Sequence, residues 1–393
     1  MKSGENTYEN SSYETPERYI WQQSDWPSWR FDAAALIAPL AAVHRAQGKL
    51  AGRMEALGLP ERQLASLQML TSDVLTTSEI EGEQLNLEAV RSSFARRLNV
   101  DIGALAPADR HVDGVVEMVL DATRYYDQPL TMTRLLAWHA GLFPPSPQVS
   151  PRFQLNTVQA GRWRDDAQGA MQVVSGSVGR QTVHFEAPPA QRLDTEIRIF
   201  LDWFNNDTGH PALDPVLKAG LAHLWFVTLH PFDDGNGRIA RAVGDMALAK
   251  VEQSTQRFYS LSAQIQRERL AYYTLLETTQ KGDLDVTAWL HWFLACLLRA
   301  ITAADSTLSA VLTKADFWQR WTGTSLNPRQ IKLLNRLLDG FEGKLTSSKW
   351  AAIAKCSPDT ALRDIQDLLE RGVLQKSEAG GRSTSYAIYN VAN

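Results

Sequence analysis

The segment 230–241 reads His-Pro-Phe-Asp-Asp-Gly-Asn-Gly-Arg-Ile-Ala-Arg, so a base, carboxylates, two glycines and two arginines stand close together. Gly235 and Gly237 allow the backbone to approach a ligand closely and to adopt positive φ. A glycine-rich turn that opens a helix is an anion site, because unpaired N–H groups and the helix dipole converge there. Arg238 and Arg241 are three positions apart on the first turn of that helix, so both can bind one polyphosphate. The pattern predicts a site for a nucleoside triphosphate.

Other residues of this segment supply the remaining chemistry. His230 stands just before the loop, where a general base for an incoming hydroxyl group has to lie. Asp234 offers a hard oxygen ligand for Mg²⁺, which typically binds through one or two carboxylates and substrate phosphates. Asn236 tolerates the left-handed region or caps the helix. A plain turn does not explain the histidine and both arginines, an EF-hand loop would need an aspartate at its first position, and a Walker A loop would need Gly-Lys-Ser/Thr. The segment therefore predicts a transferase.

The same segment matches the Fic motif, HxFx(D/E)GNGRxxR, at every specified position, and the chain therefore resembles the Fic family. The resemblance implies transfer of AMP from ATP to a Ser, Thr or Tyr hydroxyl of a target protein. It implies that His230 deprotonates that hydroxyl, that Phe232 packs beneath the loop, and that Asp234 holds Mg²⁺. The other motif residues would bind phosphates, with Gly235, Asn236 and Gly237 as the anion hole, Arg238 at the β-phosphate and Arg241 at the γ-phosphate. Positioning and charge neutralisation do most of the work in such chemistry, so few residues suffice.

A second motif lies upstream. An apolar stripe at helical spacing predicts a helix that ends at Gly82, and its members are Leu64, Leu67, Leu70, Val74 and Leu75. The end of this predicted helix resembles the inhibitory motif of Fic proteins, (S/T)xxxE(G/A)N, with Thr77 and Glu81 on one helical face. The resemblance implies that Glu81 pairs with Arg241 and competes with the γ-phosphate. Glu83 stands where the family usually has Asn, and an ordinary exposed Glu81 is the alternative. In relatives the same glutamate can position water to remove AMP, so the net direction stays open.

Between the two motifs, 171–175 and 181–186 predict a hairpin around 176–179. It resembles the flap by which Fic proteins hold a target peptide, here with Val183, His184 and Phe185. On this segment alone, a surface hairpin without a partner is a serious alternative. The segment Gly161–Arg164 resembles a structural G-x-x-R element. His139, His184 and His223 are interpreted as packed histidines rather than further catalysts.

The region after the motif helix is expected to close over the adenine. Tyr273 and Gln280 are the positional matches to the family's adenine contacts. An aromatic ring can stack on any base. The pair Tyr272-Tyr273 is also consistent with an ordinary helix core.

Composition bounds the remaining possibilities. The chain has 393 residues and a formal net charge of −4, so two or three domains are expected and no global basic field indicates nucleic-acid binding. Cys296 and Cys356 are the two cysteines and lie far apart, which predicts neither a disulfide nor a zinc site and fits a reducing cytoplasm. The apolar stretch Trp289–Ile301 is shorter than the ~18 residues of a membrane span, so no membrane partner is expected.

The sequence predicts a mainly α-helical protein with four parts. Residues 1–18 are expected to be a disordered tail, and 19–100 an N-terminal helical domain, formed from Asp32 on by a helical hairpin, that carries the inhibitory helix. Residues 101–309 are expected to form the Fic catalytic core, with the hairpin as its strands. Residues 322–393 are expected to form a winged helix-turn-helix. The Trp- and Pro-rich start of the second part, Tyr19–Trp29, resembles a domain found ahead of Fic cores in bacterial proteins.

The C-terminal part predicts helices at 327–338, 347–354 and 358–370, and then strands at 373–376 and 383–389. In a winged helix, Ser357, Thr360 and Arg363 would face DNA bases, while Lys376 and Arg382 would meet phosphates. Winged helices also serve as dimerisation or protein-docking modules, and a homodimer stays open. Acidic residues oppose DNA binding on the same helix, at Asp359, Asp364, Asp367 and Glu370. The competing interpretation is therefore a DNA-binding transcriptional regulator whose Fic core senses a nucleotide.

Overall fold

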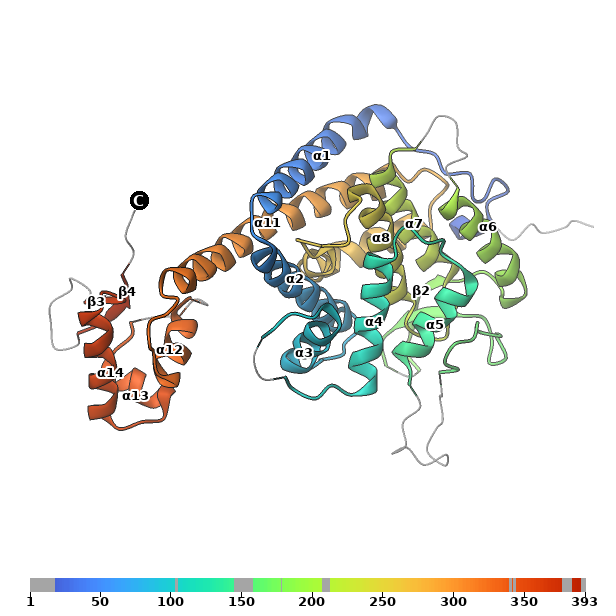
Figure 1. Cartoon of the computed structure of the whole chain (residues 1–393). Helices are drawn as coiled ribbons and strands as arrows, with labels where there is room; N and C mark the ends of the chain where they lie inside the picture. The colour runs from blue at the N-terminus through green and yellow to red at the C-terminus, as the bar shows by residue number, and fades with distance from the viewer. Residues whose placement is uncertain are drawn as a thin grey trace, which may run out of the picture. The chain divides into compact units, whose positions relative to one another are not determined.

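The computed structural model describes residues 18–102, 105–144, 158–177, 179–206, 213–338, 341, 344–376 and 384–389 (Figure 1). The chain divides into two compact units, residues 1–57 with 62–304, and residues 58–61 with 305–393. The expected disordered tail, apart from Arg18, and the wing residue Arg382 lie outside the described residues.

The larger unit is mainly helical, as the sequence predicts (Figure 1). Its helices are α1 Ala33–Glu55, α2 Leu59–Ile80, α3 Leu87–Leu98, α4 Arg110–Arg124, α5 Met132–Leu142, α6 Leu193–Asn205, α7 Pro215–Leu229, α8 Asn236–Glu252, α9 Leu261–Arg267, α10 Arg269–Gln280 and the first part of α11 Thr287–Arg320. The 3₁₀ turns are η1 Ile20–Gln22 and η3 Ala190–Arg192, and the strands are β1 Gln172–Ser175 and β2 Thr182–Glu186. The helical hairpin expected up to residue 100 is wrong, because α1, α2 and α3 are three separate helices.

Helices α7 and α8 form the hairpin that carries the motif loop. The Asp214 side chain accepts a hydrogen bond from the Val216 amide and caps α7, which is buried along nearly all of its length. His230 ends α7 with φ +46°, and Gly235 precedes α8 with φ +79°. These two left-handed residues reverse the chain within the loop, so the start of α8 lies beside the end of α7.

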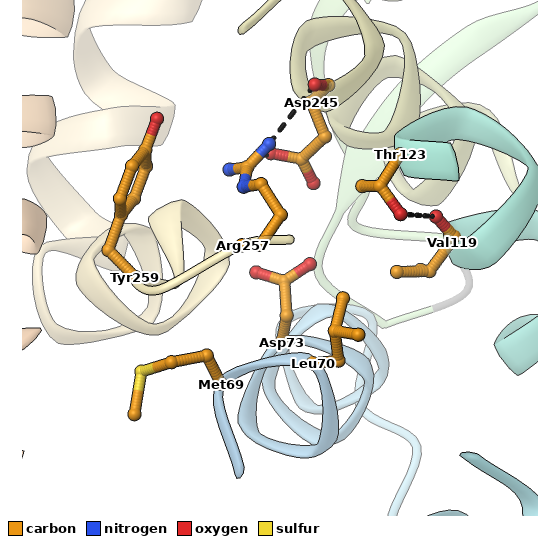
Figure 2. A pocket seen from close by; sticks show the side chains of 8 residues that line it. All are labelled: Met69, Leu70, Asp73, Val119, Thr123, Asp245, Arg257 and Tyr259. Atoms are coloured by element: carbon orange, nitrogen blue, oxygen red, sulfur yellow. Dashed lines mark hydrogen bonds and ion pairs between the residues drawn. The ribbon is translucent and has the colours of Figure 1, made fainter. Parts of the chain in front are cut away.

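A buried polar cluster joins α2 to α8 (Figure 2). Asp245 of α8 accepts a hydrogen bond of 2.8 Å from Arg257, and Asp73 of α2 accepts one of 2.6 Å from the Ser260 hydroxyl. Burial, with the Asp73 carboxylate adding to it, raises the pKa of Asp245 to about 7. The stripe residues Leu67, Leu70 and Val74 are buried, whereas Leu64 is 36% exposed. Polar and apolar contacts together hold α2 against the motif helix.

The predicted hairpin is present, one residue shorter at the start of each strand. Strands β1 and β2 pair antiparallel, with a register shift between Val173 and Val174. Phe185 of β2 is buried and packs edge-to-face on Tyr19, with ring centroids 5.3 Å apart. The Trp21 indole N–H donates to the Glu186 carbonyl oxygen at 2.7 Å. The N-terminal segment thus anchors the hairpin.

The smaller unit has the helices and strands that the sequence predicts for the C-terminal part. They are α12 Pro328–Leu338, α13 Ser347–Ala354, α14 Pro358–Glu370, β3 Leu374–Lys376 and β4 Tyr386–Ile388, with β3 and β4 antiparallel. A bridge between Leu345 and Tyr386 adds a short third pairing. The core consists of aliphatic side chains around the fully buried Trp350. The two helices of the helix-turn-helix pair match their predicted bounds.

Helix α11 contains a segment, Thr287–Asp305, that is long and apolar enough to cross a membrane by length and composition. This differs from the expectation that the apolar stretch is too short. Half of the segment is buried inside the protein, and the Trp289 indole N–H donates to the Gly220 carbonyl oxygen of α7. A buried helix in the core of a globular unit meets the same criteria.

Candidate active site

His230 presents the form of imidazole that a general base requires. Its Nδ1 lies 3.2 Å from the Val227 carbonyl oxygen. A carbonyl oxygen only accepts hydrogen bonds, so Nδ1 carries the hydrogen and Nε2 keeps its lone pair. Burial lowers the pKa of His230 to about 4, so the ring is neutral at pH 7. The histidine can therefore take a proton on Nε2.

Arg164 holds the motif loop in place from the Gly161–Arg164 segment. Its Nε donates to the His230 carbonyl oxygen at 2.7 Å, and its amide donates to the Pro231 carbonyl oxygen at 3.0 Å. Another guanidinium nitrogen donates to the Pro188 carbonyl oxygen beyond the hairpin. Arg164 is 4% exposed, so these bonds form in a desolvated setting, where charge-assisted hydrogen bonds are strong. Its role is structural, as the sequence predicts.

Phe232 and Asn236 fix the loop from within. Phe232 is fully buried and stacks on His139 with ring centroids 4.0 Å apart, as expected for the residue beneath the loop. The Asn236 side chain accepts from the Phe232 amide at 2.9 Å and donates to the Phe232 carbonyl oxygen at 2.8 Å. This side chain therefore shapes the loop, so only the Asn236 backbone remains for the expected anion hole.

The Glu81 carboxylate lies against the first turn of α8. A Cβ built on Gly237 would come within 2.2 Å of Glu81 Oε1, so only glycine leaves room for it. The first turn of a helix has amide groups without helical partners, and this end favours negative charge. Glu81 thus lies where the sequence predicts an anion hole.

Glu81 and Thr77 both bind Arg241, and the ion pair expected from the resemblance is present. Arg241 Nη2 lies 2.7 Å from Glu81 Oε1, and Arg241 Nε donates to the Thr77 hydroxyl at 2.6 Å. Burial opposes ionisation of Glu81, but the adjacent guanidinium outweighs it and lowers the pKa of this carboxyl. Arg241 is 3% exposed, and its Nη1 has no hydrogen-bond partner among the described residues. Thr77 and Glu81 thus engage Nε and Nη2 of this arginine.

Arg238 has a carboxylate partner that the sequence did not predict. Its Nη1 lies 3.0 Å from Glu83 Oε2, and Glu83 Oε1 lies 2.6 Å from Nε2 of His111 on α4. Arg238 is 5% exposed and lies over the Phe143 ring at 5.2 Å. The two arginines of the motif are thus each paired with a carboxylate from the segment after α2.

Asp234 is expected from the sequence to be a metal ligand. Its side chain is 56% exposed, and one oxygen accepts from the Gly235 amide at 2.6 Å. Among the residues that the structure describes, no group of three or more His, Cys, Asp or Glu is arranged to hold a metal ion. A single exposed carboxylate beside an anion site fits Mg²⁺ that arrives with a nucleotide, because this ion keeps most of its ligands from phosphates and water.

His223 and His139 are buried and have packing roles. His223 is 1% exposed and 2.9 Å from the Tyr272 hydroxyl, and burial lowers its pKa to about 3. His139 accepts from the Gly161 amide at 2.9 Å, which confirms both as packed residues. The interpretation of His184 as a packed histidine is wrong. Its ring links Ser175 of β1 at 2.6 Å to Glu277 of α10 at 2.7 Å at the surface.

The expected adenine and flap residues are only partly available. Tyr273 is 37% exposed, and burial, with Glu81 nearby, raises its pKa. Gln280 is buried and donates to the Thr228 hydroxyl at 3.2 Å, so its side chain packs against α7. Phe185 is also buried, which contradicts a target-binding role for its side chain. Val183 and His184 of β2 are each partly exposed.

Two protein families match separate parts of the chain. The Fic/DOC family matches residues 129–248, which include the whole motif loop and the start of α8. A domain of unknown function, DUF4172, matches residues 19–100, which include α1, α2 and α3.

Curated relatives are protein adenylyltransferases. Protein adenylyltransferase Fic from Drosophila grimshawi is 33% identical over 160 residues, which cover 41% of this chain and 28% of that protein. Protein adenylyltransferase fic-1 from Caenorhabditis briggsae is 34% identical over 84 residues, or 21% of this chain and 15% of that protein. A probable protein adenylyltransferase from Aquifex aeolicus is 28% identical over 102 residues, or 26% of this chain and 28% of that protein. The chain thus spans less than a third of the length of these relatives.

Solved structures share the fold. A Fic family protein from Desulfovibrio desulfuricans has a TM-score of 0.52 at 19% identity and covers 92% of this chain and 98% of its own. A Fic domain-containing signaling protein from Bacteroides thetaiotaomicron has a TM-score of 0.50 at 16% identity and covers 68% of this chain and 97% of its own. Residues 129–248 thus match the Fic/DOC family, and the solved structures show that the chain shares their fold.

Proposed function

We propose that this protein transfers AMP from MgATP to a Ser, Thr or Tyr hydroxyl of a target protein, and that Glu81 inhibits the transfer. The observation that carries the proposal is the Glu81–Arg241 ion pair at the start of α8, beside a neutral His230. The adenylyltransferase relatives support the reaction, and their partial coverage leaves the target unidentified. Incubation with α-labelled ATP and cell lysate, followed by mass spectrometry of labelled proteins, tests the reaction and identifies the target.

The proposed reaction uses residues of the loop and of α8. Nε2 of His230 takes the proton of the target hydroxyl, whose oxygen forms a bond to the α-phosphorus as the bond to pyrophosphate breaks. Backbone amides at the start of α8 and both arginines neutralise the charge of the phosphates. Mg²⁺ on Asp234 would supply further charge neutralisation when bound. The same loop can bind water in place of the target hydroxyl. The proposal therefore includes both the addition of AMP to the target and its removal by water.

Inhibition follows from the place that Glu81 occupies. Its carboxylate holds the guanidinium that would bind the γ-phosphate, and it lies in the anion site itself. A nucleotide that enters with Glu81 in place meets like-charge repulsion and finds Arg241 engaged. Arg241 also donates to the Thr77 hydroxyl and carbonyl oxygens, so Thr77 of α2 and Glu81 together hold this arginine by three hydrogen bonds.

The metal role of Asp234 gives a direct prediction. Asp234→Ala is expected to weaken Mg²⁺-dependent ATP binding by at least about tenfold, because it removes a proposed ligand of the metal. Calorimetry with ATP in the presence and absence of Mg²⁺ measures the effect. Asp233→Ala is the matched control, since Asp233 is the exposed neighbouring carboxylate. Unchanged MgATP affinity in the Asp234 variant would remove this residue from the metal site.

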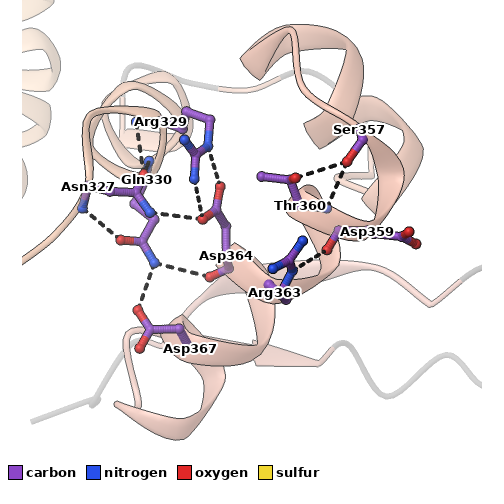
Figure 3. Close-up of polar contacts among 9 residues, drawn as sticks. All are labelled: Asn327, Arg329, Gln330, Ser357, Asp359, Thr360, Arg363, Asp364 and Asp367. Carbon is purple, nitrogen blue, oxygen red and sulfur yellow. Dashed lines mark hydrogen bonds and ion pairs between the residues drawn. The ribbon is translucent and has the colours of Figure 1, made fainter.

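DNA binding by the smaller unit is a second candidate function, favoured by the pairing of acidic residues on α14 (Figure 3). The Asp364 carboxylate is buried and bound by Arg329 at 2.8 Å, and Asp367 accepts from Gln330 at 2.8 Å. These carboxylates were expected to oppose DNA, but they bind residues of α12 within the unit. Arg363 stays exposed on α14, near the Ser357 cap.

A gel-shift assay with DNA from the protein's own promoter tests this candidate. Arg363→Ala is expected to weaken binding, because it removes an exposed cation at the proposed base-reading face. Arg336→Ala on α12, where the arginine is also exposed, is the matched control. Absence of any shift at low salt and micromolar protein would contradict DNA binding, since even non-specific complexes form in this range.

A further inference from the structure

Glu83 lies between two cations that come from different helices. Its Oε2 lies 3.0 Å from Nη1 of Arg238 on α8, and its Oε1 lies 2.6 Å from Nε2 of His111 on α4. Glu83 itself belongs to the segment between α2 and α3, two residues after Glu81. One short segment therefore supplies a carboxylate to each arginine of the motif.

His111 lies in ion-pair contact with Glu83, and this contact favours its charged form. Its Nδ1 lies 2.8 Å from the Leu142 carbonyl oxygen, and its Nε2 lies 2.6 Å from a carboxylate oxygen. The Leu142 carbonyl oxygen only accepts, so Nδ1 carries a hydrogen. Nε2 makes no hydrogen bond with the described residues, and its contact with Glu83 is an ion pair when the ring is charged. The Glu83 contact raises the pKa of His111, while burial and the Arg238 charge oppose this rise. Glu83 therefore has two positive partners.

Glu83 supplies the carboxylate oxygen that lies closest to Arg238. The nearest oxygen of Asp234 is 3.9 Å away, and Arg238 Nε has no hydrogen-bond partner among the described residues. The guanidinium is nearly buried, so losing Glu83 leaves a desolvated cation that attracts another anion. A phosphate oxygen of a nucleotide satisfies the same donors.

We propose that Glu83 is a second inhibitory carboxylate, which occupies Arg238 while Glu81 occupies Arg241, and that His111 holds Glu83 in place. The proposal rests on the proposed function for the identity of the ligand, a nucleoside triphosphate. It adds that removal of Glu81 alone frees only one of the two phosphate-binding arginines. The Glu83 side chain is 35% exposed, so it has room to leave Arg238 when a nucleotide arrives.

Nucleotide affinity in the Glu81→Gly background tests the inhibitory role of Glu83. Adding Glu83→Gln is expected to tighten binding of MgATP and of its non-reactive α,β-methylene analogue by at least about fivefold, measured by calorimetry. Glu83→Asn is a second variant that removes the charge, and Glu79→Gln changes an exposed carboxylate of α2 as the matched control. Unchanged or weaker affinity in both folded Glu83 variants would overturn the proposal. Binding is measured without transfer, so absence of AMP transfer would overturn the proposed function and leave this result intact.

The pH dependence of nucleotide affinity tests whether His111 holds Glu83 in place. Below its raised pKa the ring is charged and holds Glu83, and above that pKa the Nε2 lone pair faces the carboxylate and releases it. The affinity ratio between Glu81→Gly/Glu83→Gln and Glu81→Gly is therefore expected to shrink as the pH rises. The charged and polar groups that face the His111 ring are Arg238, Glu83 and the Leu142 carbonyl. Protonation of the nucleotide affects both variants equally, so it does not change the affinity ratio. A ratio that stays constant from about pH 6 to about pH 9 would remove His111 from the proposal.

Discussion

Replacing His230 with alanine is expected to lower AMP transfer by at least about a hundredfold while MgATP binding remains. The substitution removes the proposed base, whereas the phosphate-binding groups lie on the start of α8 and stay in place. The measurement is labelling from α-labelled ATP in the Glu81→Gly background, where inhibition is reduced. His291→Ala serves as a control, because this histidine is exposed on α11. Labelling of the His230 variant at the rate of its parent would exclude His230 as the base.

The lowered pKa of His230 also predicts how the rate of AMP transfer depends on pH. A base works when it is deprotonated, so its rate falls as the pH drops through its pKa. Burial places the pKa of His230 at about 4, and kcat/KM is expected to stay level from about pH 8 to about pH 5.5. An ordinary histidine with a pKa of about 6.5 would already lose activity in that range. A midpoint near pH 6.5 would contradict a buried, neutral base.

Replacing Glu81 with glycine is expected to raise AMP transfer by about ten- to a hundredfold. The freed guanidinium of Arg241 can then bind the γ-phosphate, and competition for such a charged contact amounts to ~1–3 kcal/mol. Self-labelling with α-labelled ATP measures the rate. Glu79→Gly controls for loosening of the end of α2, since Glu79 is exposed on the same helical turn.

The double variant Glu81→Gly/Arg241→Ala separates this explanation from a general gain of flexibility. It is expected to fall back to low activity, because the vacated site has lost its γ-phosphate ligand. If the double variant stayed as active as Glu81→Gly, Arg241 would not be the residue that Glu81 controls. A folded Glu81→Gly protein that labels no faster than wild type would contradict inhibition by Glu81.

The motif loop could be predicted from the sequence because its parts are contiguous. A glycine turn that opens a helix follows from local backbone rules, and the structure has Gly235 at positive φ just before α8, with Arg238 on the first turn and Arg241 on the next. The left-handed His230 was not predicted. Glu81 is 160 positions from Arg241 and was expected beside it only through the family resemblance. Local patterns also gave correct bounds for α13 and α14.

Contacts between distant segments could not be predicted in the same way. The contact of His111 with Glu83 depends on how α4 packs, which no pattern near either residue encodes. Phe185 was assigned to target binding because nothing in its strand indicates that Tyr19 covers it. Asp364 was counted as an exposed charge because its partner, Arg329, lies on another helix. In each case the missing information is the tertiary partner.

The most direct test of the central claim compares two labels on one protein. Glu81→Gly protein is incubated with MgATP labelled at the α-phosphate or at the γ-phosphate, and mass spectrometry follows. Transfer of AMP predicts covalent label from the α position alone, with AMP attached to a Ser, Thr or Tyr side chain and with loss of labelling in Glu81→Gly/His230→Ala. Label from the γ-phosphate alone would show phosphorylation by an inverted nucleotide and would contradict the account.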